Sequence, residues 1–318
     1  MLTRVQLNLL GRRSYLSSVV ALATSSQSAT ISLENNDDDN ADQAYGSDFD
    51  TNRKYLTFSW WLLNKGWVDI MQRVEGAVRS VFGTLNPRDL LSFDRFGELT
   101  MEVRKLIEGA TPEERRKAAW LKFLLPPKDQ EGEVIHESGI LEGNSAADFD
   151  SSPQLRHLLD ETADLIESPA FSHVLTLLLD SGFSSLVDKK LATEAFELPT
   201  ESNGFVPSAP FDAKHTKVIL LPKICSVLTR QAHVIGNGMP NEYLQDMEQV
   251  RDLEAFAAVV YSSNWESEIH NDSLMASAVH VKPEDAEKSP EDVTQSVVMV
   301  DNQGDFESAW EKAVEQKS

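Results

Sequence analysis

The sequence predicts an all-α protein, an elongated helical bundle with long acidic loops and a disordered C-terminal tail. Apolar residues recur at helical spacing in six or seven successive segments. The period-2 alternation of strands is not sustained anywhere, and residues 297–300 are the one strand-like run. The net charge of −22 is concentrated in residues 26–50, 128–150 and 262–318, so the other segments are nearly neutral. We therefore expect one helical bundle over residues 1–261 and an acidic, largely disordered tail over residues 262–318.

Two helices are predicted before the first proline. Residues 2–22 form the first, and a Ser/Asn/Asp-rich loop follows in residues 26–50. Residues 54–82 give the clearest helical pattern, because one apolar stripe advances in steps of three or four residues through Leu56, Trp60, Leu63, Trp67, Ile70, Val74, Val78 and Val81. Phe58 and Trp61 widen this stripe, so we expect other helices to cover it on more than one side.

The middle of the chain has clear helix boundaries. A helix with Phe96, Leu99, Val103, Leu106 and Ile107 on one face is expected to end at Gly109. Thr111-Pro112-Glu113-Glu114 then forms a capping box, and its helix has to stop by Pro126-Pro127. After the acidic loop, Ser152-Pro153 and Ser168-Pro169 each combine an N-cap with a proline at the first helical position.

The last part of the bundle follows a Pro/Ser/Gly-rich loop in residues 199–216. One helix is expected from Lys217 or Pro222 to Ile235, where Gly236-Asn237-Gly238 ends it. Another is expected from Pro240 to Tyr261, with Leu253, Phe256 and Val260 on its apolar face.

Composition excludes several classes of function. Nucleic-acid binding needs a concentrated basic surface, and this chain has acidic loops instead. The single cysteine, Cys225, cannot form a disulfide within the chain and lies in an apolar run, so we expect a small buried hydrophobic residue. No run reaches the roughly 18 uninterrupted apolar residues of a membrane span, so the chain as given is not expected to cross a bilayer.

The search for catalytic and metal sites gives no motif. GxSxG, GxGxxG, a phosphate-binding loop, HExxH and CxxC are all missing. We therefore expect no enzyme, no cofactor and no metal. A helical enzyme would need a pocket, formed only in three dimensions, that brings His173 or His233 to a carboxylate.

Two groups of aromatic residues can each be interpreted either as structural or as binding residues. Trp60, Trp61 and Trp67 crowd one helix, where they either pack in the core or line a groove for a partner. In the tail, Phe306, Trp310 and Val314 are spaced four apart among acidic residues. This segment is either an inert tail or a short helix that folds on a partner.

Three long strings resemble the peroxin-3 family of fungi. Residues 2–16 (LTRVQLNLLGRRSYL) resemble an internal helix of that family, residues 160–188 (DETADLIESPAFSHVLTLLLDSGFSSLVD) its central segment, and residues 247–261 (MEQVRDLEAFAAVVY) its C-terminal helix. Their order and spacing also match. The resemblance therefore covers about residues 1–261 and leaves the tail unmatched.

The resemblance implies a non-catalytic peroxisome biogenesis factor on the cytosolic face of the peroxisomal membrane. Family members are docking receptors for peroxin-19, the chaperone that delivers membrane proteins to the peroxisome, and in fungi they also receive inheritance and degradation factors. An alternative from composition is a mitochondrial helical protein, because residues 1–33 contain Arg4, Arg12 and Arg13 and no acid.

The resemblance also implies a truncated N-terminus and one part of a binding groove. Family members have over a hundred residues before the segment that begins here at Leu2, including the membrane anchor and most of the chaperone groove. We therefore expect weak chaperone binding by this chain alone, and no anchor within it. A family lysine on the other side of the groove matches Lys223, which Leu220 and Leu221 precede, although a surface lysine after two core leucines would give the same pattern.

Overall fold

The computed structural model describes residues 1–27, 49–140, 152–198, 217–237 and 240–263, with side chains from residue 1 to 19 in the first range. These residues are mostly helical, which confirms the predicted fold class. The predicted boundary at residue 261 between bundle and tail stays a prediction, because most of the tail lies outside the described residues. The chain divides into two compact units, and each is described by itself.

Unit 1 comprises residues 1–57, 139–164 and 255–318. Its described helices are α1 (Leu2–Gln27), the helical residues 49–57, the first part of α9 (Pro153–Glu167) and the last part of α15 (Arg251–Ser262). Ser152 caps α9 as predicted, since its hydroxyl accepts a hydrogen bond from the Leu155 amide at 3.2 Å. The inner face of α1 is partly polar, because Gln6 and Arg12 are buried together with Val5 and Leu9.

Buried polar groups join the helices of unit 1. The Gln6 amide donates to the Tyr55 carbonyl at 3.0 Å, and the Tyr55 hydroxyl shares a 2.5 Å hydrogen bond with Thr162. Burial raises the pKa of Tyr55. Arg12 binds Glu161 at 2.6 Å and donates to the Ser263 carbonyl at 2.9 Å. Arg12 is one of the arginines on which the presequence alternative rests, and here it connects packed helices.

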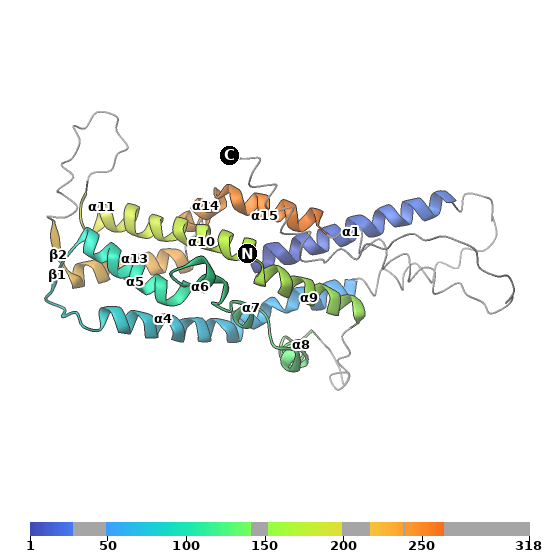
Figure 1. Ribbon diagram of the computed structural model, residues 1–318, viewed down its shortest axis with the longest axis horizontal. Helices are drawn as coiled ribbons and strands as arrows, with labels where there is room; N and C mark the ends of the chain where they lie inside the picture. Colours follow the sequence, from blue (N-terminus) through green and yellow to red (C-terminus); the bar gives the residue numbers. More distant parts are fainter. Residues whose placement is uncertain (28–48, 141–151, 199–216, 238–239, 264–318) are drawn as a thin grey trace, which may run out of the picture. The chain divides into compact units, whose positions relative to one another are not determined.

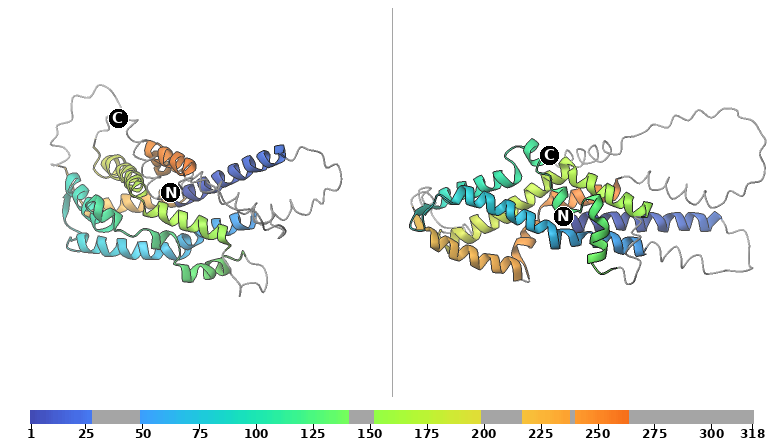
Figure 2. Two further views of the ribbon diagram at one scale, coloured as in Figure 1. Left: turned by 45° about the vertical axis from the view of Figure 1, so that its right-hand side comes forward. Right: turned by 90° about the horizontal axis from the view of Figure 1, so that it is seen from below.

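Unit 2 comprises residues 58–138 and 165–254. Its longest helices are α4 (Trp67–Phe82), α5 (Phe93–Glu108), α10 (Pro169–Ser184) and α13 (Leu221–Asn237). Shorter elements are α3 (Ser59–Trp61), the π-helix η1 (Leu62–Gly66), α6 (Pro112–Arg116), α7 (Leu121–Leu124), the 3-10 helix η2 (Lys128–Gln130), α8 (Glu131–Glu137), the π-helix η4 (Ser185–Leu191), α11 (Ala192–Glu194) and α14 (Glu242–Glu248). In every view α4 and α5 lie side by side (Figures 1 and 2).

One apolar cluster joins α5, η4, α11 and α13. Its centre contains Phe96, Leu191, Phe196 and Ile224, each at most 5% exposed, and Phe93 meets Phe196 edge to face at 5.4 Å between ring centroids. Two short strands close this end of the unit: β1 (Leu90–Ser92) pairs antiparallel with β2 (Val218–Leu220) (Figure 1). The sequence had predicted no strand here, because three-residue strands are too short to show a period.

The prediction that the apolar stripe of residues 54–82 would be the buried face of its helix was wrong. Tyr55, Phe58 and Trp61 are buried, whereas Leu56 and Leu63 are exposed. The π-helix η1 adds a residue to one turn and shifts the face beyond it. At this turn Gly66 lies against the backbone of Phe123, so the close approach of α7 determines which side of the helix faces inward.

Other boundaries also differ from the sequence prediction. The helix that Thr111 caps runs from Pro112 to Arg116, within the limit set by Pro126-Pro127, and Ala119, with a φ of 53°, separates it from α7. Part of the predicted acidic loop forms η2 and α8. The helix expected from Pro240 to Tyr261 is divided into α14 and α15. Leu106, expected on the buried face of α5, is 54% exposed.

The run from Pro169 to Glu194 is long and apolar enough to cross a membrane by length and average composition, although polar residues such as His173 and Asp180 interrupt it, so it is not the uninterrupted apolar run that the sequence analysis looked for. Its mean hydropathy over the best window is 1.3. The core helix of a soluble protein passes the same test, and here Phe171, Val174 and Leu191 are buried by neighbouring helices. We interpret this run as a core element of unit 2.

The capping box at Thr111 provides a local test of stability. The Thr111 hydroxyl accepts from the Glu114 amide at 3.2 Å, and the Glu114 carboxylate accepts from the Thr111 amide at 3.3 Å. Thr111→Ala is expected to lower the free energy of unfolding by about 1 kcal/mol. Urea denaturation would measure this loss, and an unchanged midpoint would show that the cap contributes nothing.

Candidate functional site

The candidate site lies where β2 leads into α13. In the antiparallel register, Leu90 pairs with Leu220 and Ser92 with Val218, so these side chains share one face of the ribbon. The opposite face carries Leu91 and Ile219, which enter the core cluster. The outer face is apolar and open, because Leu90 is 59% exposed, Leu220 49% and Val218 47%. We call Leu90, Val218 and Leu220 the ribbon patch.

The two predicted leucines therefore differ. Leu220 is on the open face, whereas Leu221 is half-buried and packs against the core cluster at the start of α13. Lys223 lies in the first turn of the helix with its side chain 44% exposed. Leu220 and Lys223 are thus both exposed near the start of α13, whereas Leu221 packs against the core cluster.

Lys223 does not stand alone on this surface. Its ammonium group donates to Glu197 at 2.9 Å, and Lys217 donates to the other oxygen of the same carboxylate at 3.3 Å. The hydrogen bond from Lys223, with that from Lys217, holds the pKa of Glu197 below its usual range. Two lysines share one carboxylate, so the cluster keeps net positive charge beside the ribbon patch.

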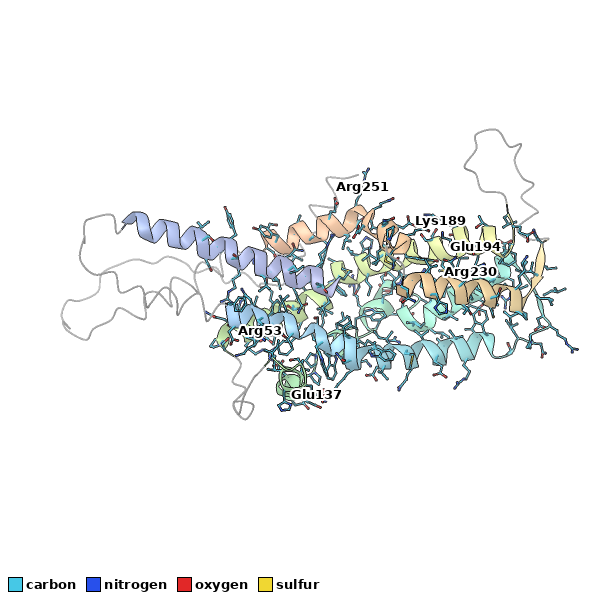
Figure 3. The ribbon with its side chains drawn as sticks, turned by 180° about the vertical axis from the view of Figure 1, so that it is seen from behind. Arg53, Glu137, Lys189, Glu194, Arg230 and Arg251 are labelled. Carbon is cyan, nitrogen blue, oxygen red and sulfur yellow. The ribbon has the colours of Figure 1, made fainter. Side chains whose placement is uncertain are left out.

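One ion pair and two hydrogen bonds further along α13 connect the helix to α11 and α14. Arg230 and Gln231 bind the two oxygens of Glu194 at 2.8 and 3.0 Å, and the Tyr243 hydroxyl donates to Gln231 at 2.8 Å. Figure 3 shows Arg230 and Glu194 close together. The helix that carries Lys223 is thus fixed on its buried side. Cys225 is exposed on this helix, so the expectation of a buried cysteine was wrong; Ile224 and Val227 take the buried face instead.

A cleft of about 360 Å³ lies between η4 and α14. Its charges are paired: Lys189 binds Asp246 at 2.8 Å, and Ser185 donates to the same carboxylate. The hydrogen bond from Lys189 lowers the pKa of Asp246. Lys190 binds Glu242 at 2.5 Å. This arrangement binds η4 to α14, with Met247 of α14 against Gly182.

A second cleft, of about 230 Å³, surrounds Arg104. Arg104 binds Glu108 through two hydrogen bonds of 2.6 and 2.8 Å and Asp180 at 2.7 Å, and its guanidinium lies 4.7 Å from the Phe183 ring centroid. Two carboxylates neutralise this cation, which makes it a structural link between α5 and α10. A third cleft, of about 620 Å³, lies between α4 and the α6–α7 segment.

The geometry gives no catalytic arrangement in the part of the chain that the structure describes. His173 and His233 are exposed, and neither lines any of the three clefts above. Across the same residues, no group of three His, Cys, Asp or Glu side chains is placed to hold a metal ion.

The family model for Peroxin-3 matches residues 1–263. The chain belongs to the Peroxin-3 family. This confirms the resemblance seen in the three sequence strings and includes the helices that carry them.

The chain is also similar to relatives named as peroxisomal proteins, with identities from 24% to 39% among the three given below. The chain is 39% identical over 279 residues to peroxisomal biogenesis factor 3 of Yarrowia lipolytica, covering 82% of this chain and 62% of the relative. It is 24% identical over 291 residues to peroxisomal membrane protein PEX3 of Komagataella phaffii, covering 81% and 62%. Peroxisomal biogenesis factor 3 of Rattus norvegicus is 26% identical over 266 residues, covering 82% and 63%. The chain thus spans less than two thirds of these relatives.

Proposed function

We propose that this chain acts in peroxisome membrane biogenesis as a docking receptor for the chaperone peroxin-19, on the cytosolic face of the peroxisomal membrane. The observation that carries the proposal is the ribbon patch beside Lys223: exposed leucines at 49–59% next to a cationic cluster on a rigid helix start. The relatives support the biological setting, since they are named as peroxisomal biogenesis factors and a peroxisomal membrane protein. No cofactor is required by this function.

The physical basis is that of a peptide site. The ribbon patch supplies apolar area, and Lys223 with Lys217 would attract an acidic flank of the incoming peptide. The core cluster beneath holds both strands and the first turn of α13, so little ordering entropy would be lost on binding. We also propose the fungal factors for peroxisome inheritance and degradation as partners of this chain.

Lys223→Glu is expected to weaken binding of a peroxin-19 peptide about tenfold, because it replaces an attraction at the rim by a repulsion. Isothermal calorimetry would measure this, first with this chain and then with a chain extended by the N-terminal part of the Yarrowia lipolytica relative. We expect the extended chain to bind more tightly, since the matched region spans 62% of that relative.

Lys105→Glu is the matched control. Lys105 is an exposed lysine of α5, away from the ribbon patch, and the substitution makes the same change in charge. Equal affinities for the Lys223 variant and the unmodified protein would remove Lys223 from the site. Equal losses in both variants would show a general charge effect rather than a local contact.

A further inference from the structure

The cleft of about 620 Å³ between α4 and the α6–α7 segment of unit 2 (Figure 1) differs from the other two clefts in its charges. Three cations line it, Arg73, Lys117 and Lys122, together with one carboxylate, that of Asp69. In the other two clefts every lining cation binds a carboxylate. Within the part of the chain that the structure describes, none of the three cations here forms an ion pair. The cleft is therefore locally positive in a chain whose net charge is −22.

The arginine of this cleft is held in place without a carboxylate. The Arg73 guanidinium donates to the Ala118 carbonyl at 2.9 Å and lies 5.8 Å from the centroid of the Trp120 ring. The hydrogen bond to Ala118 uses one N–H group of a guanidinium that carries several. Arg73 is thus positioned by α4 and by the α6–α7 segment together, and its remaining donors can bind an anion.

The opposite side of the cleft is fixed by contacts with α3 and η1. The Trp61 indole donates to the Lys122 carbonyl at 3.1 Å, and Gly66 lies against the Phe123 backbone. The Lys122 side chain stays exposed, as does that of Lys117. The backbone that carries these cations is therefore ordered before a ligand arrives, which lowers the entropic cost of binding.

Strained backbone also lines the cleft. Ala119 has a φ of 53°, a conformation that an alanine seldom adopts because its Cβ crowds the following carbonyl. Such strain persists where the surrounding structure holds it, and it gathers at ligand sites. Ala119 turns the chain between α6 and α7, and the lysines on either side of the turn, Lys117 and Lys122, both line the cleft.

We propose that this cleft binds a short acidic peptide segment of a partner protein. Carboxylates are the natural acceptors for Arg and Lys donors, and acidic motifs are recognised by clusters of such cations. A volume of about 620 Å³ is that of a ligand cleft and exceeds the size of one small ion. Ala118, Ala119 and Phe123 add apolar groups, against which the aliphatic part of a glutamate can pack. None of these residues belongs to the ribbon patch or to the lysine cluster beside it, so the inference goes beyond chaperone docking.

The confinement of the positive charge to one cleft favours a short peptide over an extended polyanion. A nucleic acid or an anionic bilayer reaches far beyond a single cleft and meets the field of a chain with a net charge of −22. A short segment within the cleft is affected less, because charges further away than about 8 Å are screened at physiological ionic strength.

Fluorescence anisotropy with the full chain tests the proposal, with labelled hexaglutamate as the probe and hexaglutamine as its uncharged match. We expect hexaglutamate to bind, more weakly as salt is raised, and hexaglutamine not to bind below about 1 mM. Lys117→Glu and Lys122→Glu should each weaken hexaglutamate binding about tenfold, and the corresponding glutamine variants by a smaller factor. Lys105→Glu on α5 is the matched control, with an expected change of less than about twofold.

Circular dichroism would first show that each variant keeps its helical content, which is expected because the substituted lysines are exposed. Hexaglutamate that does not bind below about 1 mM would overturn the proposal. So would equal losses in the Lys117 and Lys105 variants, which would show a general charge effect. A loss caused by Lys223→Glu instead would assign the peptide to the ribbon patch.

Vesicles of phosphatidylcholine and phosphatidylserine provide the remaining arm of the test. Cosedimentation that depends on Lys117 and Lys122, without binding of hexaglutamate, would make an anionic bilayer the ligand and overturn the peptide proposal. Chaperone docking is judged separately, because it is measured with a peroxin-19 peptide and the Lys223 variant. We expect Lys117→Glu to leave that affinity unchanged, so the two proposals can fail independently.

Discussion

Replacing Gly66 by alanine is expected to destabilise unit 2 by about 3 kcal/mol. A Cβ at this position would overlap the Phe123 carbonyl oxygen and lie 2.8 Å from the Phe123 carbonyl carbon. Backbone cannot rotate away as a side chain can, so either the π-helix η1 or α7 has to move. The Trp61 indole, which donates to the Lys122 carbonyl at 3.1 Å, would lose its alignment in the same movement.

Gly76→Ala is the control, because Gly76 lies in α4, which follows η1 directly, and the expected change in stability has the opposite sign. No atom lies within 4 Å of a Cβ built at Gly76. Alanine there should stabilise the protein by about 0.5–1 kcal/mol, because glycine loses more backbone entropy in a helix. Urea unfolding curves would measure the free energy of unfolding of both variants. A Gly66 variant as stable as the Gly76 variant would show that the close approach to Phe123 does not contribute to stability.

Replacing Arg12 by methionine is expected to destabilise unit 1 by about 3–5 kcal/mol. Arg12 is fully buried, Glu161 is 8% exposed, and their side chains meet at 2.6 Å. Arg12 also donates to the Val260 and Ser263 carbonyls at 3.3 and 2.9 Å, near the C-terminal end of α15, where helical carbonyls lack partners within the helix. Removal of the cation leaves a buried carboxylate without its charge partner, which costs more than the pair contributed.

A double-mutant cycle separates this cost from the loss of packing. Arg12→Met combined with Glu161→Leu removes both charges and should recover part of the stability lost in the single variant. Thermal unfolding followed by circular dichroism would give the four values. If the double variant is less stable than Arg12→Met by the full cost of Glu161→Leu alone, the two residues are not coupled and the ion pair does not hold α1 to α9.

Helix starts could be predicted from the sequence, because a helix cap depends on residues three positions apart. Family membership could be predicted as well, because the resemblance lies in continuous strings of residues. Ser152, Ser168 and Thr111 each accept a hydrogen bond from an amide three residues later, as predicted, and Gly109 ends α5 with a φ of 100°. The buried leucines of α9 follow the predicted spacing. Lys223 could be selected only through the resemblance, since an exposed lysine has no signature of its own.

Tertiary structure decided which of two apolar faces is buried. The helix around Trp61 had apolar residues on both sides. Tyr55, Phe58 and Trp61 are the buried ones, and the Trp61 indole donates to the Lys122 carbonyl of α7. Beyond them η1 shifts the buried face, and Gly66 admits the Phe123 backbone. The pairing of β1 with β2 and the burial of Arg12 against Glu161 likewise join residues far apart in sequence. A local sequence pattern determines hydrogen bonds between residues that are three or four positions apart in the chain. Burial of a side chain depends instead on neighbours that only the folded chain brings together.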